Sequence, residues 1–286
     1  MKNIKFYIGI SIAILVVGLL FLFSFTIFAV RYVEIDYKTN KVNITKSDDE
    51  IIASADFHIG GSVFFHGKSQ YIENIEQADP YIEVINIETV FPSKFIVHIK
   101  ERLEVYCFKS QYGYFVCDEK LKVLKVEASY DSTQNNAMLI SGDVVKERCE
   151  VGQTLQVENF ADIYTSLYEN NKTLAVQQTI IKQIEFQVTK DENTSKDILV
   201  ANITTFDDLH FQICNCGYGL SAKTKLFMNV FSWVFDQIGK EINLRDSSKV
   251  VLTEQLLHES TIIINNYYDI SSHSENDCYF DIVPNS

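Results

Sequence analysis

Residues 217–222 have residue types and a spacing that match a phosphate-binding motif. They read G-Y-G-L-S-A, which fits G-x-G-x-x-A between a strand-like and a helix-like stretch, and Glu241 lies about twenty residues on. In a dinucleotide-binding domain such glycines let a pyrophosphate approach the helix N-terminus, and the acid binds a ribose hydroxyl. The chain after Glu241 is too short for further βαβ units. We therefore favour a structural turn at Gly217 and Gly219.

The cysteines and histidines predict no metal site. The six cysteines form neither a C-x-x-C pair nor a zinc-ligand run, and the six histidines are scattered singly. Cys107 and Cys117 flank a predicted hairpin and could pair in an oxidising compartment, but two buried free thiols are the favoured interpretation. Neither a G-x-S-x-G nor an S-x-x-K motif for acyl-serine chemistry occurs.

The charge balance excludes one large class of partners. The whole chain carries a net charge of -13, and the part after residue 30 carries -15, because Lys2 and Lys5 are the only charged side chains before Arg31. Binding to nucleic acid normally depends on clustered lysine and arginine. We therefore exclude a nucleic-acid-binding function.

Residues 6–30 form a run without charges that is rich in Ile, Leu, Val and Phe. A helix of that length, at about 1.5 Å per residue, exceeds a hydrocarbon core of about 30 Å and predicts a transmembrane helix. A cleaved signal peptide is the alternative, but its apolar region is only about 7–15 residues long. Lys2 and Lys5 favour a cytoplasmic tail at residues 1–5, with everything after the helix outside the cytoplasm.

Residues 31–102 predict a domain of the order strand, helix, helix, strand, strand. Ser47 and Glu50 match a capping box at the start of the first helix, and Pro80 ends the second helix. Two strands then flank Pro92. Their alternation predicts one buried face made of Ile85, Ile87, Thr89, Phe95, Val97 and Ile99.

Residues 103–257 predict a β-rich domain. Several short strands precede an amphipathic helix over residues 221–239, which Ser221 can cap and Gly239 can end, and a further helix is expected at residues 160–167. The last predicted strand covers residues 249–255 and leaves one sheet edge open. Residues 258–286 form a tail that we expect to be partly mobile, with one strand-like stretch at residues 261–264.

Three stretches of this chain resemble the bacterial cell-division family of FtsQ and DivIB, in family order. In residues 84–105, a strand, Pro92, a second strand and Glu101-Arg102 match the family's P…I.V.ER run, and residues 114–118 resemble its next strand. Residues 206–211, followed by G-L at 219–220 and K-L at 225–226, resemble a later strand, turn and helix. Residues 241–245 resemble the family's I-D-L-R strand.

The resemblance implies an α+β fold with an N-terminal transmembrane helix, a POTRA-type βααββ domain, and a mixed β-rich domain that has an amphipathic helix and a C-terminal edge strand. It also implies a place in the divisome, the assembly that builds the division septum, with FtsL or its equivalent and FtsB or DivIC as partners. In this family an incoming strand extends the last strand of the β domain. The residues that match this site are Leu244, Arg245, Lys249, Val250, Val251, Leu252 and Thr253.

We therefore expect a non-enzymatic scaffold at the division septum, anchored in the cell membrane, with no catalytic residue, cofactor or metal. A membrane-anchored POTRA-type adaptor in another envelope process is the main alternative. A nucleotide-binding enzyme that uses Gly217 and Gly219 is the less favoured one.

Overall fold

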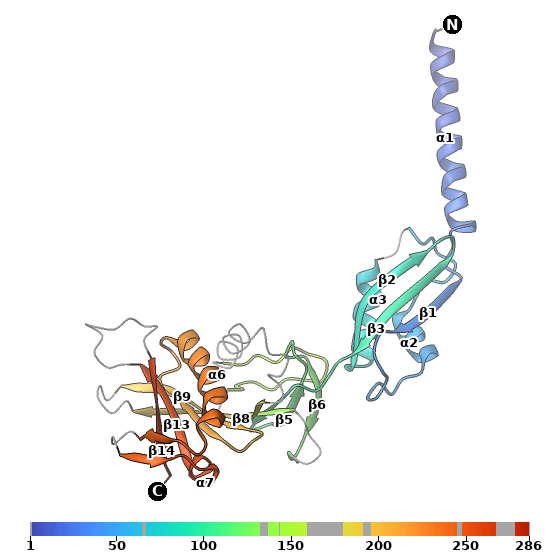
Figure 1. The fold of residues 1–286 in the computed structure, drawn as a ribbon. Coiled ribbons are helices and arrows are strands. Elements are labelled where there is room, and N and C mark those ends of the chain that lie inside the picture. Colours follow the sequence, from blue (N-terminus) through green and yellow to red (C-terminus); the bar gives the residue numbers. More distant parts are fainter. Residues whose placement is uncertain are drawn as a thin grey trace. The chain divides into compact units, whose positions relative to one another are not determined.

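The computed structural model describes residues 2–64, 67–131, 137–142, 144–158, 180–190, 196–244, 248–266 and 278–285. The chain divides into two compact units, Met1–Leu103 and Glu104–Ser286 (Figure 1). The helix predicted at residues 160–167 lies outside the described residues.

The first unit begins with helix α1 (Lys2–Thr26), whose described side chains are largely apolar and exposed. The side chains of residues 1–8, 21, 24 and 25 are not among those described. Among the residues that are described, no helix combines the length and the hydropathy of a membrane span. The transmembrane helix over residues 6–30 stays a prediction.

The rest of the first unit has the predicted order of strand, helix, helix, strand and strand. Its elements are β1 (Tyr32–Tyr37), α2 (Asp48–Ala55), α3 (Lys68–Ala78), β2 (Ile82–Val90) and β3 (Lys94–Glu101). β3 lies between the other two strands, parallel to β1 and antiparallel to β2. The predicted capping box is confirmed, since Ser47 accepts the Glu50 amide and Glu50 accepts the Ser47 amide.

β3 alternates as predicted, with Phe95, Val97 and Ile99 fully buried, but β2 departs from its pattern. Ile85 is 51% exposed because the register shifts between Val84 and Asn86, which leaves Ile85 as the extra residue of a bulge. Beyond the bulge, Ile87 is buried opposite Val97. The prediction that Ile85 is buried is therefore wrong, and the one for Ile87 is confirmed.

Glu101 and Arg102 are buried at the end of β3 and hold two neighbouring segments. The Glu101 carboxylate accepts the backbone amides of Val42 and Asn43, both at 2.6 Å. The Arg102 guanidinium donates to the Glu76 carboxylate at 2.9 Å. Glu101 therefore ties the loop before α2 to the sheet, and Arg102 ties helix α3 to it.

The second unit is built on a nine-stranded mixed sheet. Its strands are β4 (Tyr106–Ser110), β5 (Gly113–Cys117), β6 (Val123–Glu127), β7 (Met138–Ser141), β8 (Ile181–Lys190), β9 (Asp197–Thr205), β10 (His210–Ile213), β13 (Ser260–Asn266) and β14 (Cys278–Pro284). Their order in the sheet is β14-β13-β10-β9-β8-β7-β4-β5-β6. The second unit is thus rich in strands, as predicted.

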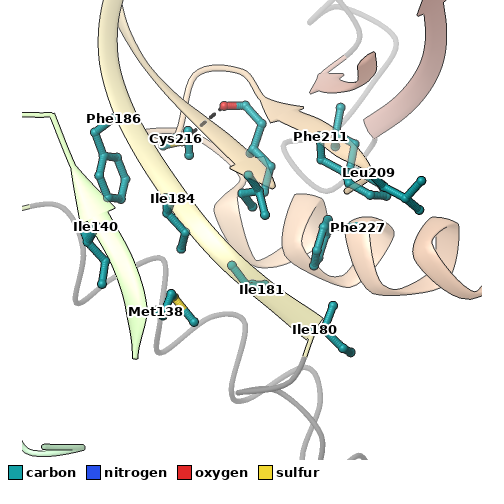
Figure 2. Packing of buried hydrophobic residues seen from close by; sticks show 14 of the residues in the cluster. Met138, Ile140, Ile180, Ile181, Ile184, Phe186, Leu209, Phe211, Cys216 and Phe227 are labelled. Atoms are coloured by element: carbon teal, nitrogen blue, oxygen red, sulfur yellow. Dashed lines mark hydrogen bonds between the residues drawn. The ribbon is translucent and has the colours of Figure 1, made fainter. Parts of the chain in front are cut away.

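Helix α6 (Leu220–Gln237) packs on β10, β13 and β14 (Figure 1). The Phe227 ring meets Phe211 of β10 at 4.8 Å between centroids, and the Trp233 ring meets Phe280 of β14 at 5.2 Å. Figure 2 shows the core beneath, where Met138, Ile184, Phe211 and Phe227 contribute side chains from β7, β8, β10 and α6. The amphipathic helix is confirmed, although Gly219 is its N-cap instead of Ser221.

Lys223 is fully buried in the first turns of α6, although it carries a cationic head group. Its Nζ donates to the carbonyl oxygens of Cys214, Asn215 and Tyr218 at 2.7, 2.8 and 2.7 Å. Burial lowers the pKa of the Lys223 ammonium to about 8 from 10.5. The lysine thereby satisfies three carbonyls of the loop that joins β10 to α6.

We predict that Ile87→Asp or Val97→Asp destabilises the first unit by several kcal/mol, because each places an unpaired charge in its core. Ile85→Asp in the same β2 strand is the matched control, and we expect it to change little, since that side chain is exposed. Hydrogen exchange of the β3 amides in the intact chain measures the effect. Equal exchange in the core variants and the control would contradict the assigned register.

We predict that Lys223→Met lowers the free energy of unfolding by about 1–3 kcal/mol at pH 7, because three carbonyls lose their donor. The unfolded lysine keeps its proton up to about pH 10.5 and the folded one releases it near pH 8, so this side chain adds stability as pH rises through that window. The gap between wild type and variant should therefore widen from pH 8 to 10.5 in urea titrations. A constant gap would mean that the folded lysine keeps its proton.

Candidate functional site

The predicted partner-binding residues lie on a small hairpin outside the large sheet. β11 (Glu241–Asn243) and β12 (Lys249–Val251) form a separate antiparallel pair, in which Ile242 is opposite Val250. The Leu244 amide donates to the Ser248 carbonyl at 2.9 Å near the turn. Arg245 lies outside the described residues.

The prediction that residues 249–255 form one strand is wrong. β12 ends at Val251, and Leu252 is fully buried, with its amide bonded to the Lys240 carbonyl. Thr253 then caps helix α7 (Glu254–His258), because its hydroxyl accepts the Leu256 amide at 3.1 Å. The threonine before an acidic first turn was the signal for this helix.

β12 still offers a short open edge. Hydrogen bonds join Leu244 to Ser248 and Leu252 to Lys240, so the N–H and C=O groups of residues 248, 250 and 252 point toward the other strand of the hairpin. Because these groups alternate along a strand, those of Lys249 and Val251 point away from β11. Both side chains are exposed, and Lys249 pairs with Glu241 across the hairpin at 3.1 Å. Within the described residues β12 pairs only with β11, so this edge is three residues long.

β14, which the sequence did not predict, is the last strand and an edge of the nine-stranded sheet. The Cys214 amide donates to the Ile264 carbonyl at 2.9 Å, so Ile264 directs its backbone groups toward β10. Strand alternation then pairs the backbone groups of Asp281 and Val283 with β13. The N–H and C=O groups of Phe280 and Ile282 are left pointing to the open edge.

The side chains of β14 hold this edge firmly in place. Ile282 is 2% exposed, and Phe280 packs edge-on against Trp233 of α6. Pro284 lacks an N–H group and ends the strand, which limits how far a second strand can extend along it. The edge is therefore ordered, seven residues long and blunted at one end.

The opposite edge of the same sheet is partly covered. The β6 residue Val123 donates its amide to the Gln153 carbonyl and accepts the Gly152 amide, both at 2.8 Å. A further bridge joins Lys122 to Thr154. β14 is therefore the more open of the two edges of the large sheet among the described residues.

The glycine motif has a structural explanation. Gly219 adopts a φ of +59°, a left-handed conformation that glycine reaches without strain, at the N-cap of α6. The loop before it turns three carbonyls inward to the Lys223 ammonium, which fills the place beneath the turn. A phosphate site needs amides that point at the ligand, so these contacts favour a packed turn at Gly217 and Gly219.

Cys107 and Cys117 cannot pair with one another. Cys107 is opposite Val116 and Cys117 is opposite Tyr106 in the β4–β5 hairpin, so the two thiols lie on opposite faces of the sheet. Both are buried free thiols, and burial raises the pKa of Cys107 to about 12. Across the described ranges, no group of three or more His, Cys, Asp or Glu side chains has the geometry to hold a metal ion.

Comparison with known proteins finds a family match within the first unit. The family model described as "POTRA domain, FtsQ-type" matches residues 28–102. These residues contain β1, α2, α3, β2 and β3, together with the buried Glu101-Arg102 pair.

A curated relative covers more of the chain. The chain is 23% identical over 193 residues to a protein named "Cell division protein DivIB" from Clostridium tetani (strain Massachusetts / E88). The match spans 68% of this chain and 63% of that protein's length. The resemblance to the FtsQ/DivIB family is thus confirmed: residues 28–102 match the family model of the FtsQ-type POTRA domain, and a longer part of the chain is distantly similar to the cell-division protein DivIB.

Proposed function

We propose that this protein is a non-enzymatic scaffold of bacterial cell division that binds other septal membrane proteins outside the cytoplasm. The match to DivIB and the FtsQ-type POTRA domain support a role in division. The observation that carries the binding part of the proposal is the open edge of β14 at the end of a large, otherwise paired sheet.

We place the partner contact on β14. The resemblance implies strand addition at residues 244–253, but β12 there is three residues long, whereas β14, the last strand of the large sheet, is seven residues long. An incoming strand gains backbone hydrogen bonds from Phe280 and Ile282, whose N–H and C=O groups point outward. Proteins of the FtsL and FtsB or DivIC type are the proposed source of the added strand. The hairpin site at residues 249–253 is the alternative contact, with a shorter edge.

The proposed anchor is the N-terminal helix. Residues 6–30 carry no charged side chain, and α1 is helical over Lys2–Thr26. We propose that α1 crosses the cell membrane with Lys2 and Lys5 in the cytoplasm, so that the chain after α1 faces outward. Collection of the protein at mid-cell would distinguish a divisome scaffold from a POTRA-type adaptor in another envelope process.

We predict that a photo-crosslinking residue at Val283 captures division membrane proteins in growing cells. Val283 lies on β14, next to the outward backbone groups of Ile282. Val126 on the β6 edge is the matched control, and Val251 on β12 tests the alternative contact. Mass spectrometry of the crosslinked products identifies the partners.

Capture from position 283 and not from position 126 is the result that supports the β14 contact. Capture from position 251 alone would move the contact to the hairpin. Capture from none of the three positions, with all variants folded, would refute strand addition at either edge.

We predict that a membrane-impermeant maleimide labels Cys149 and Cys278 in intact cells or spheroplasts. Both thiols are partly exposed, unlike the other four cysteines, which are buried. An Asn3→Cys variant is the control, and that added thiol should react only after the inner membrane is lysed. Labelling of Cys149 and Cys278 that appears only after lysis would reverse the proposed orientation.

A further inference from the structure

Three phenylalanine rings gather where α1 joins the first sheet. The Phe28 centroid lies 5.2 Å from Phe64 and 6.1 Å from Phe91, and Phe64 and Phe91 are 5.5 Å apart. Although they pack together, Phe64 is 54% exposed and Phe91 is 59% exposed. Together with Ile27, which directly precedes Phe28 and is 48% exposed, we call these residues the junction patch.

Backbone hydrogen bonds fix the junction patch next to the end of α1. The Val63 amide donates to the Phe28 carbonyl, and the Val30 amide donates to the Gly61 carbonyl, both at 2.8 Å. The Arg31 amide donates to the Ser93 carbonyl of the β2–β3 turn at 2.8 Å. Two loops that are distant in sequence are thereby held against the segment that leaves the helix.

The distance from the helix to the patch is short because of chain connectivity. Phe28 is the second residue after Thr26, where α1 ends, and two residues span at most about 7 Å. Leu22 and Phe23 near the end of α1, and Ile27 after it, are exposed apolar side chains within six residues of Phe28. Exposed apolar side chains of the helix end and of the patch are therefore close together along the chain.

The residue types of the patch point to an apolar partner. Phenylalanine and isoleucine have no polar group to satisfy in water, and a cluster of exposed aromatic side chains on a soluble surface marks an interaction site. Two cations lie close to the patch along the chain: Arg31, whose guanidinium donates to the Thr26 carbonyl at 3.1 Å, and Lys94, which follows Ser93 and pairs with Glu34. The chain after α1 is strongly acidic, so attraction to anionic surfaces does not account for this patch.

We propose that the junction patch inserts into the interface of the lipid bilayer that holds α1, and so docks the POTRA domain on the membrane. This inference rests on the proposed membrane anchor. The Phe64 and Phe91 rings enter the boundary between head groups and acyl chains, and the Arg31 guanidinium lies at the level of the lipid phosphates. The occupant is lipid because Phe28 of the patch is the second residue after α1, the helix proposed to cross the bilayer, and exposed apolar side chains occur on both.

The opposite end of β3 supplies a matched control. Val42 is 78% exposed, and its amide donates to Glu101 at 2.6 Å, which places it at the far end of the strand from the β2–β3 turn. The eight residues of β3 span about 26 Å at about 3.3 Å each. A probe at position 42 therefore lies well outside the interface if the patch is inserted.

The test is tryptophan quenching in the full-length chain, reconstituted into phosphatidylcholine vesicles that contain lipids brominated near the head group for positions 42, 64 and 91, and lipids brominated in mid-chain for position 15. The single native tryptophan is first replaced by Trp233→Phe. Phe91→Trp, Phe64→Trp and Val42→Trp are then compared, with Leu15→Trp reporting insertion of α1. We expect a loss of emission at positions 64, 91 and 15 and no loss at position 42.

Quenching at position 15 with none at positions 64 and 91 would overturn the docking inference and leave the anchor in place. Blue-shifted but unquenched emission at positions 64 and 91 would overturn it as well, because protein would then cover the patch. No quenching at position 15 would contradict the anchor, and the docking inference with it.

Discussion

The parallel pairing of β10 with β13 is the contact on which the second unit depends. Parallel neighbours cannot be joined by a tight turn, so the chain between them must cross a face of the sheet, and α6 makes this crossing. The hydrogen bond from the Cys214 amide to the Ile264 carbonyl fixes the register. That register decides which backbone groups of β14 pair inward and which stay open at the edge.

The crossing from β10 to β13 also accounts for the glycine motif at residues 217–222, which resembles a nucleotide-binding turn. The loop from β10 to α6 must reverse direction within a few residues, and Gly219 takes the left-handed conformation that the turn requires. The carbonyls that this turn directs inward need a donor, and Lys223 supplies it from within α6. A motif that resembles a nucleotide site is therefore explained by the packing of one helix on one edge of the sheet.

Local signals predicted local structure well. The capping box at Ser47, the alternation of Phe95, Val97 and Ile99, and the apolar stripe of α6 were all readable from the sequence, because each depends on neighbours a few residues away. The bulge at Ile85 was not readable, since its register depends on β3.

The candidate site was only partly predictable for the same reason. The stretch at residues 241–245 resembles a family strand, but it lies in a separate hairpin with β12. The segment that extends the large sheet beside β10 is Ser260–Asn266. Thr253 gave a local sign that the strand of Lys249 would stop, but the longer open edge belongs to β14, whose place is set by pairing with β13. Membership of a sheet is a property of distant partners, and the spacing of residues within one strand does not encode it.

The central claim is that a partner strand pairs with the backbone of β14. Hydrogen exchange resolved to single amides, measured on the full-length chain with and without its division partners, tests this most directly. The account predicts that partner binding slows exchange at the outward amides of Phe280 and Ile282, while the amide of Val251 is unchanged. Unchanged exchange at Phe280 and Ile282, with slower exchange at Val251, would contradict it.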